Sequence, residues 1–144
     1  MTRVEFYVNV SDKLRKVAEL GEEIISRGRR MMVFMPDADT SSTLERLLWT
    51  HPQTGFLPHC RSDDPLALVT PLIVDWRTEP LVHDDVLINL RNEHPPFFSR
   101  FQRLIEIVGT EEADKAEARN RYRFYRDRGY EIKSINVLET ETHE

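Results

Sequence analysis

The sequence is poor in cysteine, in glycine and in long apolar stretches. Its 144 residues include one cysteine, Cys60, which excludes an internal disulfide and any zinc site built from cysteines alone. The five glycines form neither a GxxxxGK[ST] nor a GxGxxG pattern, so the phosphate loops of P-loop and dinucleotide-binding proteins are missing. No apolar run approaches the roughly 18 residues that a membrane-spanning helix needs. We therefore expect no nucleotide cofactor, no metal and no membrane span.

Lysine is also scarce, and the overall charge is negative. Sixteen of the 20 basic residues are arginines, and 25 acidic residues bring the net charge to −5. A surface of this sign does not attract nucleic acid, so we expect no strong direct binding of DNA. Residues 1–5 lack the apolar segment of a signal peptide, which predicts a cytoplasmic protein. With 40% hydrophobic and 31% charged residues, the composition is that of one globular domain.

Strand-like and helix-like patterns alternate along the chain. Strands are expected at residues 4–8, 31–35, 72–74, 86–90, 104–108 and 130–137. Helices are expected from a cap at Ser11 to a stop at Gly28, at 40–49, at 97–101, and at 110–128 with a stop at Gly129. This order predicts an α/β sandwich with a mostly parallel central sheet. We assign residues 1–138 to a single domain and expect the acidic tail 139–144 to be disordered.

The negative chain carries one concentrated basic segment. Residues 115–128 contain six basic and two acidic side chains, a local charge of +4. Helical spacing places four of the basic residues and a tyrosine on one stripe: Lys115, Arg119, Tyr122, Arg123 and Arg126. Arginine grips a carboxylate or phosphate with two hydrogen bonds, while a tyrosine ring receives an apolar group. We expect Val108, Gly129 and Ile132 to form the floor of such a site. The alternative is a solvated basic helix face.

A second candidate surface lies where a helix runs into a loop. Trp49, Pro52 and Phe56 are bulky and apolar, and they occur where a core is difficult to build. Exposed together they would mark a protein partner site. The alternative is that Trp49 is the last core-facing residue of its helix.

Two other functions remain open from the residues alone. His51, His59, Cys60, Asp63 and Asp64 lie within 14 residues, but their spacing fits neither C-x₂-C nor H-E-x-x-H. A small metal-dependent nuclease or phosphohydrolase that uses His59, Asp63 and Asp64 is the alternative function. The third candidate is direct binding of single-stranded DNA, with bases stacked on the arginine–tyrosine stripe.

Four segments carry a resemblance to a known family. They are Phe6-Tyr7, the pattern Leu-Trp-x-x-Pro-x-x-x-Phe-x-Pro-His at 48–59, residues 86–91, and residues 118–130. Together they resemble the chi subunit of bacterial DNA polymerase III holoenzyme. The resemblance implies a Rossmann-like fold and a non-catalytic, replisome-associated accessory subunit. It also implies two partners: the acidic C-terminal tail of single-stranded DNA-binding protein, and the psi subunit, which connects chi to the clamp loader.

The resemblance also implies roles for individual residues. Arg119 would hold the terminal carboxylate of the tail, and Lys115 and Arg123 would meet its acidic residues. Four residues would receive the terminal phenylalanine ring of the tail: Val108, Tyr122, Gly129 and Ile132. Trp49, Pro52 and Phe56 fall on the patch that faces psi, or another partner such as a helicase-type repair protein.

Overall fold

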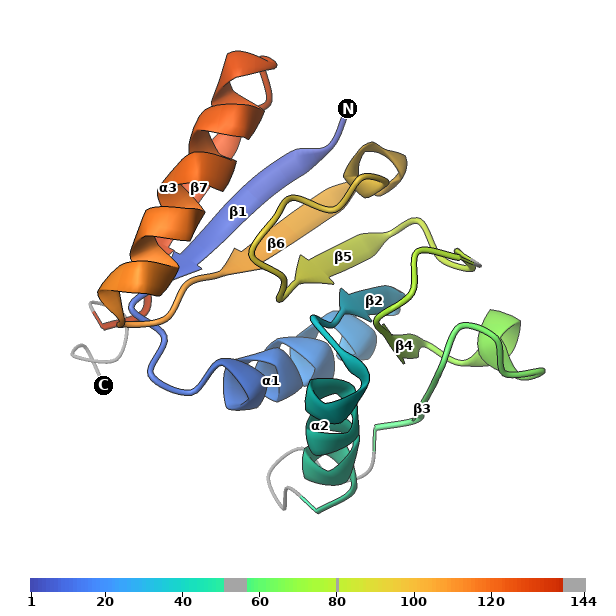
Figure 1. Ribbon diagram of the computed structural model, residues 1–144. Coiled ribbons are helices and arrows are strands. Elements are labelled where there is room, and N and C mark those ends of the chain that lie inside the picture. The colour runs from blue at the N-terminus through green and yellow to red at the C-terminus, as the bar shows by residue number, and fades with distance from the viewer. Residues whose placement is uncertain (51–56, 80, 139–144) are drawn as a thin grey trace.

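The fold is seen in a computed structural model, which describes residues 1–50, 57–79 and 81–138 (Figure 1). Its elements, with η for short 3-10 helices, are β1 (Arg3–Val8), α1 (Lys13–Ser26), β2 (Met31–Phe34), α2 (Ala38–Thr50), β3 (His59–Cys60), η1 (Ala67–Val69), β4 (Leu72–Asp75), β5 (Val86–Asn89), η2 (Phe98–Arg100), β6 (Arg103–Ile107), α3 (Glu112–Asp127) and β7 (Ile132–Asn136). The predicted strands and helices are all present, with ends shifted by a few residues.

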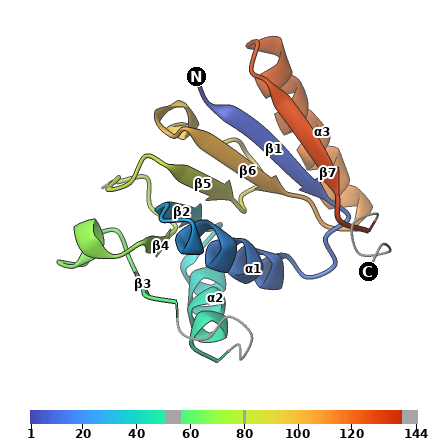
Figure 2. The same ribbon diagram turned by 180° about the vertical axis from the view of Figure 1, so that it is seen from behind.

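In the described part of the chain, seven strands form one sheet in the order β3-β4-β2-β5-β6-β1-β7. Every pairing between neighbouring strands is parallel. Helices α1 and α2 cover one face of the sheet and α3 covers the other, at the β1–β7 end (Figures 1 and 2). The predicted α/β class with three layers is confirmed, and the sheet is entirely parallel rather than mostly so.

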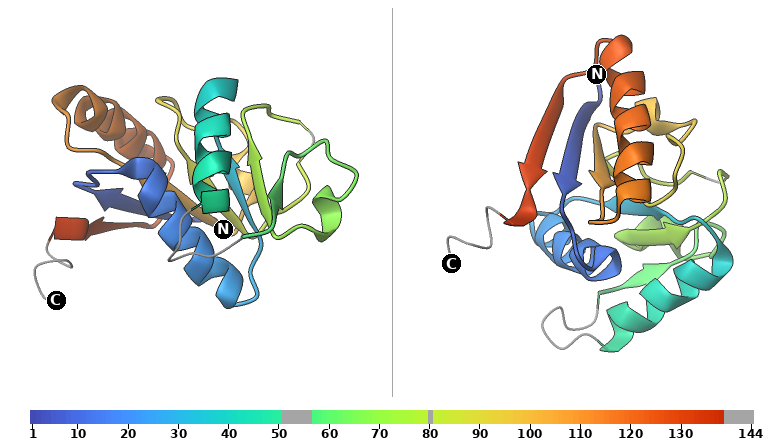
Figure 3. Two further views of the ribbon diagram at one scale, coloured as in Figure 1. Left: turned by 90° about the horizontal axis from the view of Figure 1, so that it is seen from below. Right: turned by 60° about the vertical axis from the view of Figure 1, so that its left-hand side comes forward.

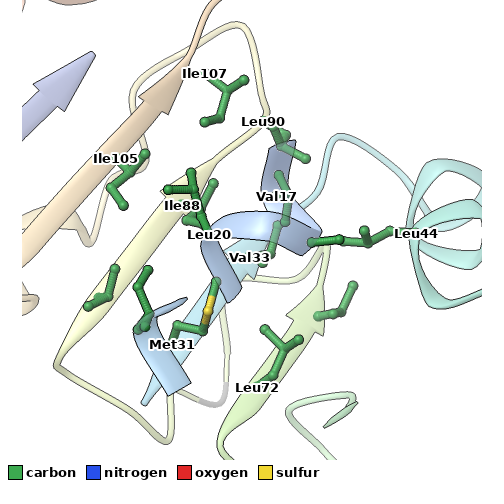
Figure 4. Packing of buried hydrophobic residues seen from close by; sticks show 14 of the residues in the cluster. Val17, Leu20, Met31, Val33, Leu44, Leu72, Ile88, Leu90, Ile105 and Ile107 are labelled. Carbon is green, nitrogen blue, oxygen red and sulfur yellow. The ribbon is translucent and has the colours of Figure 1, made fainter. Parts of the chain in front are cut away.

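The two faces of the sheet support two hydrophobic clusters. All four residues of β2 are buried, as expected of a strand covered on both sides. Met31 and Val33 pack with α1 and α2, where Leu44 reaches toward the strands (Figure 4). Met32 and Phe34 point to the opposite face and join the cluster beneath α3. The period of two along the strand therefore divides one apolar run between both cores.

The helix ends follow local chemistry, with one correction to the sequence prediction. Asp12, rather than Ser11, caps α1, because its carboxylate accepts a hydrogen bond from the backbone N–H of Arg15 at 3.2 Å. Gly28 and Gly129 end α1 and α3 as expected, with φ angles of 76° and 82° that side chains other than glycine rarely adopt.

Hydrogen bonds and a cation–π contact connect the carboxyl ends of β2, β4 and β5. Asp75 accepts hydrogen bonds from Ser62 and from Arg77, at 2.7–2.9 Å. Burial opposes its ionisation, but the hydrogen bonds from Arg77 and Ser62 outweigh burial and hold the pKa of Asp75 well below its usual range. Arg91 stacks its guanidinium 4.7 Å from the centroid of the Phe34 ring and donates to the carbonyl of Trp76. Arg91 therefore serves to join strands at this edge.

The structure bears on membrane spanning but not on the C-terminal tail. Among residues 1–50, 57–79 and 81–138, no helix has both the length and the apolar character to cross a bilayer. The acidic tail predicted at 139–144 lies outside the described residues, so its predicted disorder stays a prediction.

Candidate functional site

Helix α3 is fixed to the sheet by a buried charged network. Glu106 of β6 is fully buried and accepts hydrogen bonds from the Arg121 guanidinium at 2.9 Å and from the Tyr125 hydroxyl at 2.6 Å. The Asn89 amide donates to both carboxylate oxygens of Glu106 at 3.1 Å. Burial raises the pKa of Glu106, while the charge of Arg121 and the hydrogen bonds oppose that shift. Arg121 therefore belongs to the core, although it lies within the basic segment 115–128.

The rest of the basic segment separates into partnered and unpartnered groups. Arg126 forms an ion pair with Asp127 at 3.2 Å, and Arg123 donates to the side chain of Asn120 at 2.8 Å. Lys115 and Arg119, in contrast, form no ion pair with any residue that the structure describes. Two neighbouring cations are thus available to an external anion on the exposed face of α3.

These two cations line a cavity of about 310 Å³ between α3 and the ends of β1 and β7. Its apolar lining comes from four residues: Phe6, Val8, Val108 and Ala118. Tyr122, 37% exposed, closes one side with its ring centroid 5.6 Å from that of Phe6. Figure 3 shows α3 beside β1 and β7. The cavity combines positive charge with an apolar floor.

The structure brings together most of the predicted stripe. Val108, Lys115, Arg119 and Tyr122 share the cavity, and Arg123 joins Arg119 and Tyr122 around an adjoining hollow of about 220 Å³. Two further predicted residues, Gly129 and Ile132, do not appear in its lining. Gly129 follows the last turn of α3, and Ile132 pairs with Val4 near the start of β1, so both lie toward the other end of the helix.

Five lining residues were not predicted from the sequence: Phe6, Val8, Asn9, Ala118 and Ser134. Phe6 belongs to a predicted strand and to the family resemblance, but neither gave it a role in the site, and Ser134 lies on an edge strand without any distinctive pattern. Asn9 has a φ of 62°, which makes it the one non-glycine residue with positive φ in the described chain. An asparagine directly after a strand was the available signal, since asparagine tolerates this conformation.

A larger cavity of about 450 Å³ lies next to this one, at the carboxyl ends of β1 and β6. These adjacent strands lead into α1 and α3 on opposite faces of the sheet, the place where open α/β folds usually bind ligands. Its lining includes Glu111, Asp114 and Glu117, and Asp114 pairs with Lys13 at 3.3 Å. Acidic groups dominate this larger cavity, so its lining does not suit an anion.

The second predicted surface is described only in part. Trp49 is 65% exposed at the end of α2, so it is not the last core-facing residue of its helix. Its ring meets that of His59 edge-to-face, with centroids 6.0 Å apart. A cavity of about 400 Å³ adjoins both side chains. Pro52 and Phe56 lie outside the described residues.

The residues of the hydrolase alternative have other contacts. Arg77 holds Asp63 through two hydrogen bonds of 2.9 and 3.0 Å, and the Nδ1 of His59 donates to the Leu57 carbonyl at 2.8 Å. Burial raises the pKa of the Cys60 thiol, which disfavours the nucleophilic thiolate. In the described ranges no three His, Cys, Asp or Glu side chains are placed to share a metal ion. This geometry does not favour the alternative.

Comparison with known proteins settles the family. The family model described as "DNA polymerase III chi subunit, HolC" matches residues 1–133. The chain belongs to the DNA polymerase III chi subunit family. DNA polymerase III subunit chi of Pseudomonas aeruginosa is 33% identical over 136 residues, covering 92% of this chain and 94% of the relative. The Haemophilus influenzae protein of that name is 28% identical, covering 92% of this chain and 96% of the relative. The Escherichia coli protein of that name is 27% identical, covering 81% of this chain and 80% of the relative. The predicted family resemblance is confirmed.

Proposed function

We propose that this chain is a non-catalytic adaptor of the replisome in the cytoplasm. It binds the acidic C-terminal tail of single-stranded DNA-binding protein and docks a psi-type subunit that leads to the clamp loader. The proposal rests on one observation above all. Lys115 and Arg119, which form no ion pair within residues 1–50, 57–79 and 81–138, lie beside a cavity with an apolar floor. That arrangement suits an anion next to an aromatic ring.

The chemistry of such a tail fits this cavity. A tail that ends in aspartates, proline and phenylalanine carries a terminal carboxylate beside an aromatic ring. The apolar lining around Phe6 and Val108 receives the ring, while Arg119 and Lys115 bind the carboxylate. Arg123 stands one turn further along α3, beside the adjoining hollow, and meets the preceding aspartates. The remaining surface of a chain with net charge −5 repels DNA itself.

A titration with a short synthetic tail peptide tests this proposal, with a bare single-stranded oligonucleotide as the competing ligand. We expect the labelled peptide to bind by fluorescence anisotropy, and more weakly as salt rises, because exposed charges are screened. The oligonucleotide should not bind at physiological salt. Tight binding of the oligonucleotide without binding of the peptide would support direct DNA binding instead.

Charge reversal on α3 locates the peptide. Arg119→Glu should weaken binding about 30-fold or more, since loss of one charge-assisted contact costs about 2–5 kcal/mol. Arg126→Glu makes the same change of net charge on the same helix, but at a side chain already paired with Asp127. It should change affinity only about threefold, as expected for a rim charge. Equal losses in both variants would show a diffuse electrostatic attraction and not a site.

The exposed Trp49 supports the docking of a second protein. A tryptophan that is 65% exposed at a helix end is typical of the aromatic anchors in protein interfaces. Its place at the end of α2, on the face of the sheet opposite α3, separates it from the tail site (Figure 1). One chain can therefore hold both partners at once, as an adaptor must.

A further inference from the structure

Asn9 combines an unusual backbone conformation with a place in the cavity wall. It follows β1 directly and has a φ of 62°, in the left-handed region. Residues other than glycine occupy this region at some energetic cost, and such residues are concentrated at functional sites. The conformation sets Asn9 against the cavity that Lys115 and Arg119 line from the other side.

The hydrogen bonds around Asn9 fix the orientation of its side-chain amide. The Oδ1 of Asn136 accepts a hydrogen bond from the backbone N–H of Leu138 at 3.1 Å, which identifies that atom as the oxygen. The same oxygen lies 3.1 Å from the Asn9 amide, so Asn9 must present its NH₂ group there. An NH₂ group has two hydrogens, and this contact uses one of them. The second makes no hydrogen bond to the described part of the chain and remains available as a donor.

A second neutral donor lies on the same wall. Ser134 of β7 lines the cavity and is exposed, and its hydroxyl makes no hydrogen bond to any part of the chain that the structure describes. The cavity thus has two polar walls over an apolar floor: the cations Lys115 and Arg119 on α3, and the uncharged donors Asn9, directly after β1, and Ser134, in the middle of β7.

We propose that Asn9 and Ser134 donate hydrogen bonds to the terminal carboxylate of the bound peptide and are specificity residues for a free carboxyl terminus. A carboxylate offers about four acceptor positions on two oxygens, which suits donors on two opposing walls. A terminal amide replaces one oxygen with a donor that Asn9, Lys115 and Arg119 cannot accept. This inference rests on the proposed function, and it adds Asn9 and Ser134 to the cations on α3 as groups that bind the carboxylate.

The variant Asn9→Asp tests it, because aspartate has nearly the same shape and also tolerates positive φ. It replaces the donor with a carboxylate that repels the ligand. The probes are the tail peptide with a free carboxyl terminus and the same peptide with a terminal amide. Wild type should prefer the free acid. Asn9→Asp should weaken binding of the free acid about tenfold or more and the amide much less, so that the preference is lost. Ser134→Ala should weaken the free acid about fivefold.

Asn92→Asp is the matched control. It makes the same substitution at a residue that lines the neighbouring acidic cavity and should keep the preference of the wild type. Asn9→Gly accepts the same φ without an amide, so it should also lose the preference even if Asn9→Asp does not fold. The inference is wrong if folded Asn9→Asp and Asn9→Gly keep the wild-type preference while Arg119→Glu loses the peptide. If wild type binds neither peptide, the proposed function fails instead.

Discussion

Replacing Arg121 with methionine should separate the architecture of α3 from its binding face. Methionine fills similar space but leaves Glu106 buried without its cation. Glu106 has no exposed side-chain surface and Arg121 only 4%, so water cannot replace the lost partner. Removing one member of a buried ion pair costs about 3–5 kcal/mol. The hydroxyl of Tyr125 and the amide of Asn89 still donate to Glu106, which places the expected loss near the lower end.

The loss should depend on pH in a defined direction. Burial raises the pKa of Glu106 in the folded protein, and removing Arg121 raises it further. A carboxyl group whose pKa is raised by folding stabilises the fold below its unfolded pKa, and that contribution is lost as pH rises through the folded pKa. The difference between wild type and Arg121→Met should therefore be largest at neutral pH. It should shrink below the ordinary glutamate pKa of 4.5, where the carboxyl is protonated in both states.

Urea unfolding followed by circular dichroism measures this difference at neutral and acidic pH. The double variant Glu106→Gln, Arg121→Met removes both charges and should recover much of the stability lost in the single variant. A loss that is the same at both pH values, with no recovery in the double variant, would show that Arg121 stabilises α3 by packing alone. Arg119→Glu, on the exposed face, should change stability by no more than about 0.5 kcal/mol.

Two further predictions concern the other sites. Trp49→Ala should abolish co-purification with a psi-type partner and leave the affinity for the tail peptide unchanged, because Trp49 is exposed on the face away from α3. Loss of both interactions would contradict two separate sites. Asp75→Asn should lower the free energy of unfolding by about 2 kcal/mol at neutral pH, since the buried carboxylate that accepts hydrogen bonds from Arg77 and Ser62 is removed. Because folding lowers the pKa of Asp75, its contribution is present above the unfolded pKa of 3.8 and is lost as pH falls through the folded pKa, so the two proteins should converge in acid. Constant separation across that range in thermal or urea unfolding would contradict the assignment.

The sequence predicts the sheet well because its strands are buried on both faces. An uninterrupted apolar run such as 31–35 is typical of a strand that is covered on both faces, and Gly28 marks the end of the helix before it. The strand order is a different matter. No local sequence pattern predicts that β1 pairs with both β6 and β7, since the strand order depends on which helix covers which face of the sheet.

The basic stripe shows which part of the candidate site the sequence could not predict. Arg121 looks like its arginine neighbours in the sequence, and only the carboxylate across the core distinguishes it. A signal was present, because Glu106 interrupts the apolar run 104–108, and a charged residue in a buried strand requires a partner. Asn9 and Ser134 reach the cavity from opposite ends of the chain. Tertiary contacts alone bring such residues together, so spacing in the sequence does not reveal them.

The most direct test of the central claim is to map where the tail peptide binds by following backbone amide NMR signals during a titration. We expect the shifts to concentrate at Lys115–Arg123 on α3, at Val8 and Asn9, and around Ser134. Residues around Trp49 should remain unchanged. Saturable shifts around Trp49 and His59, with no change in the signals of α3, would contradict binding of the tail at α3.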